Sequence, residues 1–473
     1  MGGALRGNAA YDAALERRQA LMGASGARAL VKNFKVARIA AFACIGGVLY
    51  GYNQGMFSGI LAMPSFGKHM DGYIDNPTLK GWLTAILELG AWFGTLLSGF
   101  VAEVFSRKYG VLVATAVFML GVIIQITSIT GGHESILAGR FITQDEARDV
   151  LANLRGLPHD HELIQLEFLE IKAQSLFEKR SIAEHFPHLQ EQTAWNIFKL
   201  QFVSIKSLFT SRAMFKRVIV ACLVMLFQQW SGINAVLYYA PQIFEQLGLS
   251  ENTTSLLATG VVGVAMFIAT IPAVLWIDRV GRKPVLTVGA IGMGTCHIII
   301  AIILAKNIDN FHNAPAAGWA AVCMVWLFVI HFGYSWGPCA WIIVAEIWPL
   351  STRPYGVSLG ASSNWMNNFI VGQVTPDMLV GITYGTYIIF GLLIYTGAAF
   401  VWFFVPETKR LSLEEMDLVF GSEGTAQADF ERMAEINRDI GLTELLERDH
   451  HGSAAIGEEL EKPKIDSANH ERV

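Results

Sequence analysis

Long apolar runs recur along this chain, and they constrain its fold more than any other feature. A helix needs about 20 apolar residues to cross a hydrocarbon layer about 30 Å thick. The runs have that length, are rich in Gly, Ala, Phe, Leu, Ile and Val, and contain few polar residues, mainly amides. The sequence therefore predicts an all-α polytopic membrane protein with about nine full transmembrane spans. We expect these spans at residues 37–60, 82–102, 110–130, 217–240, 256–277, 284–305, 319–345, 357–380 and 384–405.

Composition agrees with a membrane protein and excludes several other classes. Hydrophobic residues make up 53% of the 473 residues and charged residues only 16%, whereas a soluble domain carries about 25% charged residues. Because 35 Lys and Arg stand against 40 Asp and Glu, the net charge is −5, which argues against a basic nucleic-acid-binding protein. All five cysteines lie in apolar stretches, which favours buried free thiols over disulfides.

Basic residues at the ends of the apolar runs orient the chain. Positive side chains are enriched on the cytoplasmic side of membrane proteins. They crowd residues 1–36 and several later turns, whereas the opposite loops of the second half carry only Lys306. We therefore expect cytosolic tails at 1–36 and 406–473. The C-terminal tail is charged and dotted with Gly, Ser and Ala, so we expect partial disorder there, with a short helix beginning within 411–417.

An internal repeat is visible, and it is broken. The motif Glu-x-x-Ser-Arg-Lys at 103–108 recurs as Asp-x-x-Gly-Arg-Lys at 278–283, and transporters are often built from repeated halves. Four apolar runs follow the second copy, but one run and a fragment, 132–143, follow the first. The polar, basic segment 144–216 would then lie outside the cell, against the positive-inside bias. Sequence missing after Thr143 is the simplest explanation.

The predicted organisation follows from these boundaries. It comprises a cytosolic N-terminal tail at 1–36, a truncated N-terminal helical bundle at 37–143, a cytosolic helical linker at 144–216, a complete C-terminal six-helix bundle at 217–405 and a cytosolic C-terminal tail at 406–473.

Several motifs in the second half occur together and in a fixed order. They are Gln-Gln-Trp-Ser-Gly-Ile-Asn at 228–234, Tyr-Tyr-Ala-Pro at 238–241, Asp-Arg-Val-Gly-Arg-Lys at 278–283, Gly-Pro-Cys-Ala-Trp at 337–341, Glu346 with Arg353, Ser-Asn-Trp at 363–365 and Pro-Glu-Thr-Lys at 406–409. By these motifs the chain resembles the sugar porters of the major facilitator superfamily, most closely the fungal hexose-type members, from about residue 37 to 420. The resemblance implies two six-helix bundles joined by a cytosolic helical linker. By that comparison, part of the fourth helix and all of the fifth and sixth are absent here.

Amide side chains are the best candidates for binding a sugar. Each offers two donors and an acceptor without a buried charge, which suits hydroxyl groups. Gln228, Gln229 and Asn234 would not share one face of an ideal helix, but Gly232 permits a local break. From the residues alone, hydrogen bonding between helices is the stronger interpretation. The resemblance favours sugar binding instead, and implies these site residues: Gln228, Gln229, Asn234, Trp341 and Asn364.

Two further groups of residues have roles implied by the resemblance. Tyr238 and Tyr239 match the outer gate of the family, with core packing or an interfacial position as the alternative. Charged residues at helix ends would form networks that hold one state of a rocking transporter and break in the other. Their alternative role is to set topology alone. The charged set is Glu103, Arg107, Asp278, Arg282, Glu346, Arg353 and Glu407.

The resemblance also bears on mechanism. Proton-coupled members carry Asp where this chain has Asn53, and an amide cannot titrate, so we expect facilitated diffusion. Gly263 stands where many relatives have a sugar-contacting Asn. The sequence contains no Gly-x-Ser-x-Gly, phosphate-loop, HExxH or CxxC motif, so we expect no enzyme, cofactor or metal site.

The sequence thus predicts a multi-pass plasma-membrane carrier that moves a hexose-type sugar by alternating access. Its expected partners are the small-molecule sugar and the lipid bilayer, without nucleic acid; protein partners stay open. Because the N-terminal bundle is incomplete, two alternatives remain. The chain could be a sugar sensor or receptor, or a transport-dead truncated product of a sugar transporter gene.

Overall fold

A computed structural model describes the chain over residues 51, 55–70, 72–96, 172–184 in part, 193–249, 252–308, 310–409, 411, 413–421 and 425–441. Within these ranges every regular element is a helix, which confirms the all-α prediction. The chain divides into two compact units. The larger unit contains the described residues from 51 to 96 and from 193 to 426, and the smaller unit contains those of 172–184 and 427–441.

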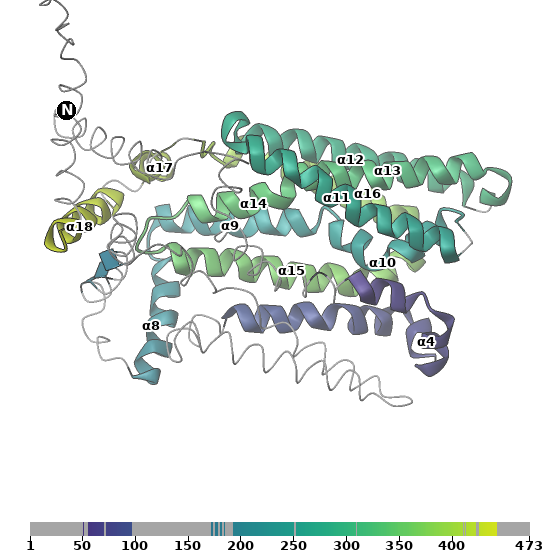
Figure 1. The fold of residues 1–473 in the computed structure, drawn as a ribbon, viewed down its shortest axis with the longest axis horizontal. Helices are drawn as coiled ribbons and strands as arrows, with labels where there is room; N and C mark the ends of the chain where they lie inside the picture. Colours follow the sequence, from purple (N-terminus) through teal and green to yellow (C-terminus); the bar gives the residue numbers. More distant parts are fainter. Residues whose placement is uncertain are drawn as a thin grey trace, which may run out of the picture. The chain divides into compact units, whose positions relative to one another are not determined.

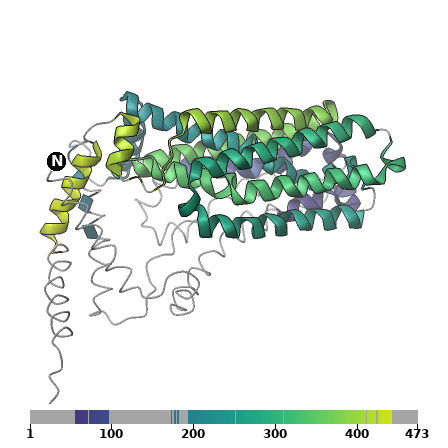
Figure 2. The same cartoon turned by 90° about the horizontal axis from the view of Figure 1, so that it is seen from above.

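Long helices of the second half form the core of the larger unit and run side by side (Figures 1 and 2). Their ends lie within a few residues of the predicted spans. By length and composition, four described segments could cross a membrane: Arg212–Gln246, Arg282–Asn307, Pro315–Glu346 and Tyr384–Phe404. The helices are α9 (Arg212–Gln229), α10 (Ile233–Gln246), α11 (Asn252–Val280), α12 (Arg282–Asn307), α13 (Pro315–Tyr334), α14 (Trp336–Glu346), α15 (Arg353–Gly381) and α16 (Tyr384–Phe404).

Two of the predicted spans are broken helices. Between α9 and α10, Gly232 adopts φ 87°, a left-handed conformation that glycine tolerates and most residues do not. This confirms the break predicted there. The span 319–345 breaks at Ser335 (φ −120°, ψ −88°), where α13 ends. Pro338 lies just after that break, in the first turn of α14, where its missing N–H removes no helical hydrogen bond.

A helix at 77–96 packs antiparallel against α15. It begins five residues before the predicted span 82–102, and residues 97–102 lie outside the described part. Thr78 contacts Asp377 near its start, whereas Trp92 donates to Ser362 near its end. The short helices α4 (Pro64–His69) and η1 (Tyr73–Asp75) precede it. The predicted span 37–60 is only partly described, and 110–130 lies outside the described residues.

Gly81 sets the close approach of this helix to α15. A Cβ atom at Gly81 would lie 2.3 Å from the carbonyl oxygen of Gln373, so Gly81→Ala must push the two backbones apart. Overpacking costs about 1–3 kcal/mol, more than the roughly 1 kcal/mol that alanine gains over glycine in a helix. We expect Gly81→Ala to lower the melting temperature of the purified chain in detergent micelles.

Gly381→Ala is the matched control, since a Cβ atom there would meet nothing within 4 Å. We expect it to melt at or above the temperature of the unmodified chain. Equal melting temperatures for the two variants would show that helix 77–96 does not pack on α15 as described.

Helices also occur in the predicted linker and tail. Helix α8 (Ala194–Ser207), capped by the Thr193 side chain, lies within the linker. Helix α17 (Leu413–Phe420) is the short helix predicted near 411–417. A second tail helix, α18 (Thr425–Asp439), falls where we expected partial disorder. In the smaller unit, acidic residues of α18 pair with Arg180 of the linker: Asp439 at 2.7 Å and Glu435 at 3.9 Å.

Candidate substrate-binding site

The predicted amides lie around the break between α9 and α10, with Gln228, Gln229 and Asn364 buried and Asn234 half-buried. Gln228 and Gln229 are the last two residues of α9, Asn234 is in the first turn of α10, and Asn364 faces them from α15. Gln228 is 2% exposed and Asn364 is 2% exposed. A buried amide without a hydrogen-bond partner is costly, so each partner of these side chains matters.

Gln228 joins the two broken spans to α15. Its Nε2 donates to the carbonyl oxygens of Trp336 (2.8 Å) and Gly337 (3.2 Å) in the first turn of α14. Its Oε1 accepts a hydrogen bond from Nδ2 of Asn364 at 2.6 Å. The Gln228 side chain therefore connects the end of α9 with the start of α14 and with Asn364 of α15.

Asn234 connects these amides, through Asn368, to the helix 77–96. Its Nδ2 donates to Oε1 of Gln229 at 2.5 Å and to Oδ1 of Asn368 at 2.8 Å. Asn368 in turn donates to Oε2 of Glu88 on the helix 77–96 at 2.9 Å. We call Gln228, Gln229, Asn234, Asn364 and Asn368 the central amides.

Both predicted gate tyrosines are buried and hydrogen-bonded. The Tyr238 hydroxyl lies 2.9 Å from Oε1 of Glu88 and 2.9 Å from Oδ1 of Asn368. The Tyr239 hydroxyl donates to the carbonyl oxygen of Gly372 at 2.7 Å. Tyr238 thus contacts the central amides directly, and a gating role for either residue stays a prediction.

Trp341 has a different environment. It is half-buried on α14 and packs against the apolar core. Within the described residues it forms no hydrogen bond with the central amides, so an aromatic contact with substrate remains a prediction for it. Gly263, at the position of a family Asn, has open space where a Cβ atom would be.

Two residues outside the predicted set also contact these amides. Asn368 on α15 links Asn234 to Glu88. Glu88 is fully buried, with 0% exposure. A signal was available, because an ionisable residue within a predicted span is a functional candidate by default.

Charged residues at the start of α12, at the end of α14 and in the segment after α16 form a second network. Arg282 pairs with Glu346 at 2.9 Å, and Glu346 also accepts from the Thr408 hydroxyl at 2.6 Å. Glu407 accepts from the backbone N–H groups of Arg282 and Lys283, each at 3.0 Å. A carboxylate at the N-terminus of a helix is favourable, because unpaired N–H groups point toward it.

Other members of the predicted charge set are only partly described. Arg353 donates to the carbonyl oxygen of Trp348 at 3.4 Å. The side chain of Asp278, and all of Glu103, Arg107 and Asn53, lie outside the described residues. Their predicted roles therefore stay predictions.

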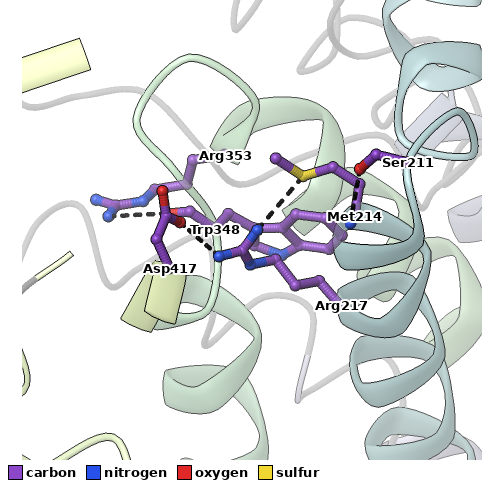
Figure 3. A network of polar contacts seen from close by, with 6 residues as sticks. All are labelled: Ser211, Met214, Arg217, Trp348, Arg353 and Asp417. Carbon is purple, nitrogen blue, oxygen red and sulfur yellow. Dashed lines mark hydrogen bonds and ion pairs between the residues drawn. The ribbon is translucent and has the colours of Figure 1, made fainter. Parts of the chain in front are cut away.

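A buried ion pair that the sequence did not predict joins α9 to α17 (Figure 3). Nη2 of Arg217 on α9 lies 2.5 Å from Oδ1 of Asp417 on α17, and their side chains are 0% and 5% exposed. The guanidinium also lies 4.8 Å from the Phe420 ring centroid. Trp348 and Met214 border the pair in Figure 3, and Met214 Sδ accepts from Arg217 at 3.7 Å.

Gly281 allows Glu407 to cap α12. Its backbone has φ 103° and ψ 156°, a region essentially restricted to glycine. A Cβ atom there would lie 2.7 Å from Oε2 of Glu407. We expect Gly281→Ala to displace this carboxylate and destabilise the chain by about 1–3 kcal/mol, measured as a lower melting temperature in detergent.

Gly421→Ala separates backbone strain from the clash. Gly421 also has positive φ, 76°, but a Cβ atom there would meet nothing within 4 Å. We expect a smaller loss for this control. If the two variants lose the same stability, Glu407 does not depend on Gly281.

Comparisons with known proteins agree with this architecture. The family described as "Sugar (and other) transporter" matches residues 39–144 and 143–420. A probable quinate permease of Aspergillus niger is 30% identical over 414 residues, covering 83% of this chain and 72% of that protein. The major facilitator-type transporter ecdD of Aspergillus rugulosus is 27% identical over 482 residues, covering 81% and 86%.

Solved structures support the same fold. A crystal structure of a D-xylose-proton symporter aligns with a TM-score of 0.58 at 21% identity, covering 80% of this chain and 100% of that chain. An inward-open structure of the xylose transporter XylE from E. coli also gives 0.58, at 20% identity, covering 81% and 99%. Because the family matches most of the sequence and these structures share its helical fold, the chain belongs to the sugar transporter family of multi-pass membrane proteins, with the major facilitator fold.

Proposed function

We propose that this chain is built as a carrier for a neutral hexose-type sugar, working by alternating access in the plasma membrane. The observation that supports this most is the set of central amides, which are neutral side chains, four of them buried, joined to one another by three hydrogen bonds. A sugar hydroxyl both donates and accepts, so it can replace an amide partner without leaving a buried group unpaired. We propose Gln228, Gln229, Asn234 and Asn364 as sugar ligands, with Trp341 as an aromatic contact.

Several similar proteins are named quinate permeases, so an organic acid is the substrate class that competes with a neutral sugar. Quinate is a ring of hydroxyl groups that also carries a carboxylate. Within the described residues, no basic side chain contacts the central amides: Lys80 on the neighbouring helix binds Gln242 instead, at 3.1 Å. A buried anion without a partner is strongly unfavourable. We therefore propose a neutral sugar or polyol ahead of an organic acid.

The charged network suggests how the two states differ. Arg282, Glu346, Glu407 and Thr408 tie the start of α12 to the end of α14 and the segment after α16. Such contacts can hold one state and separate in the other. Asn53 favours a facilitative mode, since an amide at that position carries no proton.

A second candidate function follows from the division of the family match. The two matched segments meet at residues 143 and 144. The alignment with ecdD is 482 residues long, but it includes only about 383 residues of this chain, which is 81% of 473. About a hundred aligned positions of ecdD therefore have no counterpart in this chain. Three lost spans with their loops would remove at least ~60 residues. A truncated carrier that binds sugar without moving it is therefore the alternative.

Two measurements test the proposal together. The transcript is sequenced across the codons for Gly139 to Arg148, and radiolabelled glucose, xylose and quinate uptake is measured in yeast that lack hexose uptake. We expect saturable sugar uptake, without quinate uptake, by the chain or by a longer transcript that restores the helices. Sugar binding to purified protein without uptake would support the truncated alternative. Quinate uptake without sugar uptake would overturn the proposed substrate class.

A further inference from the structure

The break between α9 and α10 interrupts helical hydrogen bonding within the proposed binding site. The last carbonyl oxygens of a helix lack helical N–H partners, and such groups bond elsewhere when they are buried. Here the carbonyl oxygen of Gln228 accepts from the Ser231 hydroxyl at 2.6 Å, and that of Gln229 accepts from the Gly232 N–H at 3.1 Å. Both of these partners come from the break itself.

The carbonyl oxygen of Ser231 is bonded by a side chain from another helix. Nε2 of His297, on α12, lies 2.8 Å from this oxygen. A carbonyl oxygen only accepts, so Nε2 carries the hydrogen and His297 is the donor. Ser231 and His297 are buried, with exposures of 0% and 1%. Loss of the donor would therefore leave a buried carbonyl oxygen unpaired.

His297 also packs against the glycine that makes the break possible. A Cβ atom at Gly232 would lie 3.3 Å from Nε2 of His297 and 2.9 Å from the Phe390 ring. The ring centroid of His297 is 5.9 Å from that of Phe390 on α16 and 4.4 Å from that of Phe328 on α13. The imidazole is thus held between two aromatic rings, with Nε2 directed at the break.

The break sets where the proposed sugar ligands stand relative to one another. Gln228 and Gln229 end α9, whereas Asn234 lies in the first turn of α10, three residues after Ser231. The hydrogen bond from Nδ2 of Asn234 to Oε1 of Gln229, 2.5 Å long, spans the break. A change in backbone direction at Ser231 therefore moves Asn234 relative to the two glutamines.

We propose that His297 is a positioning residue for the sugar site, which holds the break between α9 and α10 in its binding geometry by donating to the Ser231 carbonyl oxygen. This role rests on the function proposed above and gives α12 a part in substrate affinity. His297 acts through the backbone and not on the sugar itself. When its hydrogen bond is lost, the unpaired carbonyl oxygen favours other conformations of the break. The binding-competent conformation is then less populated, and the apparent affinity falls by the same factor.

Two variants of similar side-chain length separate the hydrogen bond from the packing of the ring. Gln carries an Nε2 donor as many bonds from the backbone as Nε2 of His, whereas Met has a methyl group there. H297Q and H297M both lack the imidazole, so they differ chiefly in the bond to Ser231. We expect H297M to bind radiolabelled sugar about 5-fold or more weakly than H297Q, with H297Q close to the unmodified chain.

Hydrogen–deuterium exchange of the full chain in detergent tests the break without a substrate. The amides of Gly232 and Val236 report on it, since they donate to the carbonyl oxygens of Gln229 and Gly232 at 3.1 Å each. We expect these amides to exchange about 5-fold faster in H297M than in H297Q, because the break opens more readily. Amides of α11 provide the reference and should exchange equally in the two variants.

Y387F is the control for disturbance around the imidazole. The ring centroids of Tyr387 and His297 are 6.1 Å apart, and the buried Tyr387 hydroxyl has no hydrogen-bond partner in the described part of the chain. We expect Y387F to keep the sugar affinity and the amide exchange of the unmodified chain. If Y387F changes both as H297M does, general disturbance explains the effect and His297 has no specific role.

The two measurements distinguish this role from the function on which it rests. Equal exchange at the break in H297M and H297Q would overturn the role of His297, whether or not the chain binds sugar. Faster exchange in H297M with the affinity of H297Q would also overturn it, because the break would then not position the ligands. An unmodified chain that binds no sugar would refute the proposed function, and exchange alone would then decide whether His297 holds the break.

Discussion

Asp417→Asn is expected to lower the free energy of unfolding by about 3–5 kcal/mol, because it leaves the Arg217 guanidinium charged and buried without a counter-ion. Both side chains are almost fully buried, 0% and 5% exposed. Figure 3 shows the pair between α9 and α17, beside Trp348. Chemical unfolding of the purified chain in detergent, followed by circular dichroism, measures the loss.

An exposed ion pair of the same chain provides the control. Nη2 of Arg180 lies 2.7 Å from Oδ2 of Asp439, but these side chains are 39% and 48% exposed. Exposed pairs contribute about 0–1 kcal/mol, so Asp439→Asn should change the stability little. If the two variants lose similar stability, burial does not decide the strength of the Arg217–Asp417 pair.

A double variant separates the pair from the charge left behind. Arg217→Met with Asp417→Leu removes both charges and keeps apolar volume, and such replacements are often neutral or stabilising. We therefore expect the double variant to be more stable than Asp417→Asn alone. A double variant as unstable as the single one would mean that α17 depends on the specific ion pair to dock.

The sequence predicted much of the fold because helix breaks and spans have local signals. Apolar runs of the required length marked α9–α16, and Gly232 marked the break between α9 and α10. The break between α13 and α14 falls at Ser335, and Pro338 lies in the first turn of the new helix, where proline is tolerated. The tail helix α18 was missed because it lacks an apolar run.

Long-range partners had no comparable signal. Glu88 and Asn368 are 280 residues apart, and Arg217 and Asp417 are 200 residues apart. Which charge finds which partner depends on how helices pack, and no local pattern encodes that. The family resemblance predicted that Gln228 and Asn364 bind the same substrate, and the structure shows that their amides bond to each other at 2.6 Å.

Gln228→Leu is expected to have the largest effect on sugar binding. The substitution removes the donor to Trp336 and Gly337 and the acceptor for Asn364 at once. A buried polar group left without a partner costs about 1–3 kcal/mol. If a sugar hydroxyl uses the same side chain, affinity should fall about 5- to 150-fold. Equilibrium binding of radiolabelled sugar to the purified protein measures this loss.

Asn367→Leu is the matched control for that experiment. Asn367 is an amide on α15, three residues from Asn364, but it accepts from the Trp230 indole at 3.0 Å and donates to the Ser363 carbonyl oxygen at 2.7 Å. Its loss should lower stability without a comparable loss of affinity. Melting temperatures of both variants separate the two effects. A Gln228→Leu protein that binds sugar normally while melting lower would show that these amides only hold the helices together, because a ligand role requires affinity to fall beyond any loss in stability.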